Sequence, residues 1–165
     1  MFSNPYILLL AGLVPMIVGF VWYGPLFGKP WMKVNGFTEE SLKGGNMVLI
    51  MGLSYILSMI LATGLMGLTN HQSGVMQLFA SHPDFEVVGS EVNTLYNTVM
   101  DNFGDRHRDF KHGALHGGLA AILIALPLIA INALFERRGG KYIGIHFGYW
   151  FVTLILMGGV VCQWL

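Results

Sequence analysis

Hydrophobic residues run along this chain in four long windows that contain no charged residue. The windows span residues 1–28, 44–83, 112–135 and 142–165, and every charged residue lies in one of three short segments between them. A membrane-spanning helix needs about 20 predominantly apolar residues, and each window can hold one. The pattern therefore predicts an all-α, four-helix transmembrane bundle that forms a single domain over residues 1–165. The expected spans lie near residues 6–27, 46–69, 113–135 and 143–164.

The long connection between the second and third spans, residues 70–112, carries a different pattern. Apolar residues recur at i, i+3 and i+4 from Val92 to Phe103, and polar residues fill the rest of the helical wheel. Ser90 is placed to cap this helix. We expect an amphipathic helix that lies on the outer membrane surface or over the bundle. A docking surface for a partner protein is the alternative. Residues 74–85 can extend the second span before the chain turns.

The distribution of charge predicts the orientation. The first and third charged segments each hold three basic residues, with two and one acidic residues, whereas the second holds three basic and six acidic residues. By the positive-inside rule, the first and third connections are cytoplasmic. Both termini and the 70–112 loop then face outward, as in a multi-pass protein of the bacterial inner (cytoplasmic) membrane. The first window lacks a preceding basic residue and a small-residue cleavage site, so we expect a membrane helix there and not a signal peptide.

Composition narrows the class of protein further. Hydrophobic residues make up 54% of the chain and charged residues 11%, which is too apolar for an ordinary soluble domain. The net charge of zero argues against a nucleic-acid partner. The one cysteine, Cys162, excludes an internal disulfide. The bilayer is thus the first expected partner, followed by a second copy of the chain or another membrane protein.

Several motifs resemble those of a known family. The run "WYGPLFGKPWM" (22–32) followed by "GFTEE" (36–40) is similar to the opening signature of the bacterial membrane family called domain of unknown function 1761. The runs "HGALHG" (112–117), "NALFERR" (132–138) and "GYWFVTLILMGG" (148–159) resemble later segments of that family in the same order. The resemblance implies a small four-helix membrane protein. It implies no activity, substrate or catalytic residue.

Histidines gather toward the expected outer side and form the first candidate site. His112 and His116 stand at i, i+4, so they share one face if the entry to the third span is helical. They could share a transition metal, with Asp109 or His71 completing the ligand set. The same groups could instead relay protons or make structural hydrogen bonds.

A second polar group is expected near the cytoplasmic side. Asn132, His146 and Tyr149 lie within spans, where polar side chains usually face the bundle because lipid cannot satisfy them. They form either a small polar pocket or simple interhelical hydrogen bonds. The residues expected at the lipid interface are Trp22, Tyr23, Lys29, Trp31, Arg137, Arg138 and Lys141.

The functional expectation follows largely from what the spans lack. No nucleophile–base pair is evident, and no Asp or Glu lies within a span, so we expect neither an enzyme nor a cofactor. Glycines at packing spacing favour close helix contacts. The leading interpretation is a structural or interaction protein, either a homo-oligomer or an accessory subunit of a membrane complex. The alternative is an oligomeric transporter or channel for a small solute or metal ion that uses the outer histidines. An interfacial enzyme acting on a lipid or a quinone-like substrate has the least support.

Overall fold

Four long apolar helices form the body of the protein. The computed structural model describes residues 4–165, and these residues form helices and connecting turns with no strand. The helices that are long and apolar enough to cross a membrane are Tyr6–Leu26, Met47–Thr69, Phe110–Phe135 and Gly140–Trp164. The predicted all-α fold with four membrane-spanning helices is confirmed, and each boundary falls within three residues of its predicted position.

Two of the four spans are not continuous α-helices. In chain order the spans consist of α1 (Tyr6–Val21) with the π-helical turn η1 (Trp22–Leu26); α3 (Met47–Thr69); α6 (Phe110–Ala120), the π-helical turn η2 (Ala121–Ala125) and α7 (Leu126–Phe135); and α8 (Gly140–Trp164). The shorter helices are α2 (Gly28–Asn35), α4 (His71–Phe79) and α5 (Glu91–Phe103). A π-helical turn inserts an extra residue into the hydrogen-bond ladder, so it redirects the side chains that follow.

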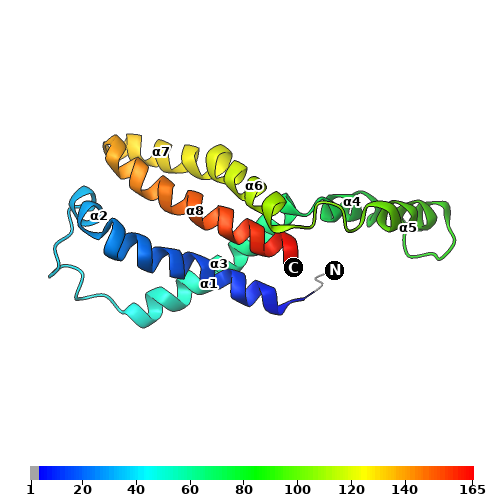
Figure 1. Ribbon diagram of the computed structural model, residues 1–165, viewed down its shortest axis with the longest axis horizontal. Helices are drawn as coiled ribbons and strands as arrows, with labels where there is room; N and C mark the ends of the chain where they lie inside the picture. The colour runs from blue at the N-terminus through cyan, green and yellow to red at the C-terminus, as the bar shows by residue number, and fades with distance from the viewer. Residues whose placement is uncertain (1–3) are drawn as a thin grey trace.

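The bundle has two chemically different ends (Figure 1). One end carries α4 and α5 together with the start of α1 and the end of α8, and we call it the hairpin end. The other end carries the two charged connections, residues 27–46 and 136–139, and we call it the basic end. Because the four spans alternate in direction, the first residue of α1, Tyr6, and the last residue of α8, Trp164, both lie at the hairpin end.

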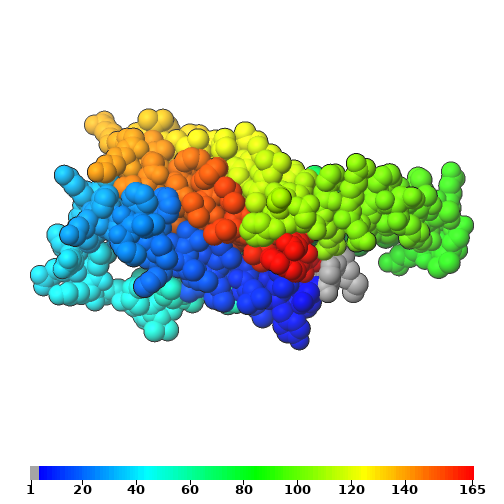
Figure 2. All heavy atoms as spheres, in the orientation of Figure 1, coloured from blue at the N-terminus to red at the C-terminus, as the bar shows by residue number. Residues whose placement is uncertain are grey.

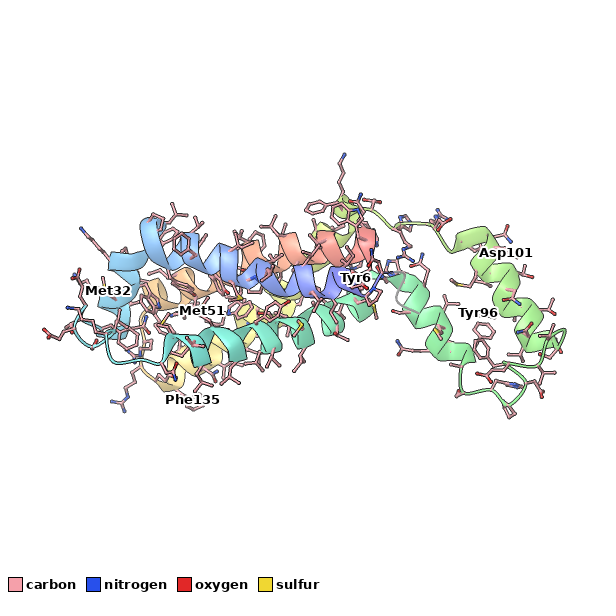
Figure 3. The ribbon with its side chains drawn as sticks, turned by 90° about the horizontal axis from the view of Figure 1, so that it is seen from below. Tyr6, Met32, Met51, Tyr96, Asp101 and Phe135 are labelled. Carbon is pink, nitrogen blue, oxygen red and sulfur yellow. The ribbon has the colours of Figure 1, made fainter. Side chains whose placement is uncertain are left out.

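Helices α4 and α5 form a hairpin that extends beyond the bundle. The predicted amphipathic helix is present as α5, and the Ser90 hydroxyl accepts a hydrogen bond from the Asn93 amide at 3.1 Å, which caps it. Of the two placements expected for α5, the one over the bundle is wrong, and the one on the outer membrane surface stays a prediction. The Tyr96 ring of α5 packs against Phe79 and Phe85 instead, with centroids 5.8 and 5.0 Å away. Figure 3 shows Tyr96 between the two helices, whose mutual packing covers part of the apolar face of α5.

Helix α8 lies at the centre of the bundle and touches every other span. Its closest neighbour is α6, where a Cβ atom added to Gly113 would collide with the Gly158 carbonyl and one added to Gly117 with the Leu154 carbonyl. The two backbones therefore touch, as small residues permit in membrane helices. Gly148 likewise receives the Trp22 ring, whereas Gly144 has open space beside it. Fully buried Met157 and Val161 anchor the core from α8.

Helices α1 and α3 meet near the hairpin end and separate toward the basic end (Figures 1 and 3). Where they meet, a Cβ on Gly12 would lie 2.9 Å from Met59, and the Tyr55 hydroxyl donates to the Leu9 carbonyl at 3.0 Å. Toward the basic end the first half of α3 is largely exposed. Figure 2 shows a hollow between the two segments at this end.

Candidate functional site

The histidines collect where the hairpin joins the bundle. His71 is the first residue of α4, because Asn70 takes an extended conformation that ends α3. His112 and His116 lie one turn apart on α6, which begins at this point because the Asp109 carboxylate accepts a hydrogen bond from the His112 amide at 2.9 Å. The i, i+4 spacing then directs both imidazoles to one face. Three side chains from two helices thus converge on one place.

The geometry of the three imidazoles is close to that of a metal site. The Nε2 atoms of His71 and His112 lie 3.0 Å apart, so one ring donates its N–H to the other. Candidate ligand nitrogens of His71, His112 and His116 all lie within 4.8 Å of one another. A tetrahedral metal about 2.0–2.1 Å from each nitrogen would separate the nitrogens by roughly 3.4 Å. The separations of the ligand nitrogens, 3.0 Å between the Nε2 atoms of His71 and His112 and at most 4.8 Å within the group, are close to this value.

Neighbouring groups hold the cluster in place. The His107 ring stacks on His112, with centroids 4.9 Å apart and planes at 21°. His107 has a positive φ of 62°, a left-handed conformation that is uncommon outside glycine. Its carbonyl accepts a hydrogen bond from the buried Cys162 thiol at 3.3 Å, which ties this loop to α8. Beside His71, the buried Asn70 Oδ1 has no hydrogen-bond partner within residues 4–165, so an acceptor remains available there.

The structure leaves Asp109, the other predicted ligand, outside this group, and His82 also lies outside it. Asp109 serves as the N-cap of α6 and does not belong to the group of converging ligand atoms. His82 lies in the hairpin turn, where its Nδ1 accepts from the Asp84 amide at 3.2 Å. His107 was not expected as a neighbour. It lies in a turn before α6, so the helical spacing that relates His112 to His116 does not include it.

The second polar group has a different composition from the one expected. His146 contacts Tyr23 from the first span, with 3.1 Å between the Tyr23 hydroxyl and Nδ1. The Tyr149 hydroxyl donates to the Pro15 carbonyl at 3.0 Å. Asn132 is exposed on α7, and within residues 4–165 its side chain forms no hydrogen bond with His146. Tyr23 and His146 are 123 positions apart in sequence, so only the packing of η1 on α8 could bring them together.

Trp22 and Trp31, two of the residues expected at the lipid interface, lie beside this second group. The Trp22 indole donates to the Ile145 carbonyl at 3.0 Å, and the Trp31 ring lies 5.4 Å from Tyr23. The Arg138 guanidinium donates to the Val34 carbonyl at 3.1 Å and forms an exposed ion pair with Glu136 at 3.6 Å. The two aromatic rings therefore brace the bundle. The charged heads of Lys29, Arg137 and Lys141 are exposed.

Comparison with known proteins places the chain in a family. Residues 6–162 match the family described as "Protein of unknown function (DUF1761)", which is nearly the whole chain. The chain belongs to the DUF1761 family. No curated protein and no solved structure matches it.

The motifs that suggested DUF1761 occupy the two polar sites of the structure. The run "HGALHG" supplies His112 and His116 to the histidine cluster and its glycines to the contact with α8. The run "WYGPLFGKPWM" forms η1 and the first half of α2, and it supplies Tyr23 to the contact with His146. The DUF1761 description assigns no activity, so the functional argument rests on the geometry of these sites.

Proposed function

We propose that this integral membrane protein binds a divalent transition-metal cation through His71, His112 and His116. The observation that carries the proposal is the convergence of their ligand nitrogens within 4.8 Å. Imidazole donors suit zinc, copper and nickel. Three protein ligands leave a fourth position for water or for a passing ligand, as in open zinc sites.

The placement of charge supports an outward-facing site. The two connections at the basic end and the first turn of α8 together hold six basic and three acidic residues, which favours a cytoplasmic location for that end. The histidine cluster would then face the outside of the bacterial inner membrane, where it could take up a cation before any transport step. This is the proposed orientation, with both termini on the same outer side.

Metal titration of the purified full-length chain tests the proposal. We expect one Co²⁺ per chain with the visible spectrum of a tetrahedral site, displaced by Zn²⁺. His112→Ala should lower the affinity at least tenfold, by analogy with lost metal-site groups (about 10–100-fold). His82→Ala is the matched control, because His82 lies in the hairpin turn away from the cluster. Equal Co²⁺ binding by both variants would overturn the proposal.

A second candidate function is protein interaction through the hairpin. Leu78, Val87 and Val88 are 80%, 54% and 91% exposed there, outside the four spans. Exposed apolar side chains that gather on one segment mark interaction sites. They favour a homo-oligomer or an accessory subunit of a membrane complex, neither of which needs catalysis. Val88→Asp should reduce the mass of the detergent-solubilised assembly, whereas an unchanged assembly would contradict this role.

A further inference from the structure

A large groove opens between α1 and α3 on the side of the bundle, toward the basic end. Its volume is about 800 Å³, within the range of small-molecule sites. It lies far from the histidine cluster in the fold, and its walls come from α1, η1, α3 and α8, with Trp31 of α2 at its end. The groove exists because α1 and α3 cross tightly at Gly12 and Met59 and then separate.

The lining of the groove is mainly apolar, and three of its hydroxyl groups are already hydrogen-bonded within the protein. The Ser58 hydroxyl donates to the Ser54 carbonyl at 2.7 Å, and the Tyr149 hydroxyl donates to the Pro15 carbonyl at 3.0 Å. The Tyr23 hydroxyl is engaged by His146. These three hydroxyls already have partners within the protein, and most of the other lining residues are apolar, so the groove favours an apolar ligand over a polar one. An apolar chain fits its chemistry.

The groove is also open to the membrane interior. Its walls belong to segments that are apolar and long enough to span a bilayer, and Phe20 and Leu57 are 80% and 64% exposed along it. A chain of lipid can therefore enter sideways without crossing water. Occupancy by an acyl chain would cover these side chains and add van der Waals contact along the helices.

The end of the groove is basic. Trp31, which lines it, stands on α2 between Lys29 and Lys33, whose side chains are exposed. The two connections at this end and the first turn of α8 together carry a surplus of three positive charges, from six basic and three acidic residues. Basic residues beside a membrane span attract anionic headgroups. Apolar walls and a cationic rim together match an anionic amphiphile.

We propose that this groove binds an anionic phospholipid, with an acyl chain between α1 and α3 and the headgroup beside Lys29 and Lys33. The site is independent of the metal centre, and its success or failure leaves the metal proposal untouched. It also gives the exposed first half of α3 a stable neighbour within the membrane.

Native mass spectrometry of the full chain in mild detergent tests the proposal, with added phosphatidylglycerol or phosphatidylcholine as the probe. The variant Ser54→Trp is designed to fill the groove with an indole ring, because Ser54 lines it. The matched control is Leu53→Trp on the same helix, because Leu53 is exposed but does not line the groove. We expect Ser54→Trp to weaken retention of phosphatidylglycerol about tenfold, the order expected from losing roughly ten van der Waals contacts between the acyl chain and the helices. The control should retain the lipid as the native chain does.

A second variant tests the contribution of the lipid headgroup separately from that of the acyl chain. The double substitution Lys29→Gln and Lys33→Gln should abolish the preference for phosphatidylglycerol over phosphatidylcholine while a lipid is still retained. Equal retention by Ser54→Trp and Leu53→Trp would overturn the proposal, because it indicates bulk annular lipid. A native dimer that only Ser54→Trp dissociates would also overturn it, because the occupant would then be a second copy of the chain.

Discussion

At the residue scale, side chains that are not candidate ligands shape the histidine cluster. The Cys162 thiol donates to the carbonyls of Thr69 and His107 at 3.6 and 3.3 Å. It thus connects the end of α3 and the loop before α6 to α8. The cluster is positioned by this buried cysteine and by the Asp109 cap, although neither was expected to have that role.

The hydrogen bond between Tyr23 and His146 leads to a prediction at the same scale. Tyr23→Phe keeps the ring but removes the hydroxyl that bridges η1 and α8. We expect the free energy of unfolding in detergent to fall by about 0.6 kcal/mol, the average for such bonds between membrane helices. Tyr6→Phe is the control, since Tyr6 is exposed. An equal decrease in both variants would show that the bridge contributes nothing.

At the element scale, the contact between α6 and α8 depends on glycine. In a helix interior, alanine is normally more favourable than glycine by about 1 kcal/mol. At Gly117, however, the new Cβ would collide with the backbone carbonyl of Leu154, so the two helices would have to separate. We expect Gly117→Ala to lower the thermal midpoint measured by circular dichroism in detergent.

In the control variant, the same substitution should not lower the thermal midpoint. Gly64 lies inside α3 with open space where its Cβ would go. Gly64→Ala should therefore leave the midpoint unchanged or raise it. If both alanine variants are equally stable, the backbones of α6 and α8 are not in contact. The spacing of Gly113 and Gly117 indicated packing, but it could not identify α8 as the partner.

The hairpin shows which features of a helix are determined by nearby residues in the sequence. Its helix α5 was predicted correctly, including the Ser90 cap, because periodicity and capping act within a few residues. The packing of α5 against α4 was not predicted, because that packing depends on contacts of Tyr96 with Phe79 and Phe85. Those rings are indistinguishable in sequence from rings that would face the bundle.

At the scale of the whole molecule, the proposed orientation can be tested by cysteine labelling. In a Cys162→Ala background, Val88→Cys should react with an impermeant thiol reagent in intact cells, because Val88 is exposed on the hairpin. Gly140→Cys at the basic end should be shielded until the membrane is permeabilised. The reverse pattern would contradict the positive-inside assignment.

The sequence by itself determined the four spans, the amphipathic helix and the grouping of charge. Each of these follows from local composition and period, because a bilayer requires a minimum apolar length and helices repeat every 3.6 residues. Tertiary structure alone decided that His71 and not Asp109 joins His112 and His116, that Tyr23 meets His146, and that α1 and α3 separate into a groove. These contacts join residues far apart in the chain, and they depend on how closely each pair of helices can approach. Glycines such as Gly12 and Gly117 permit a close approach, but the sequence does not show which residue of another helix faces them.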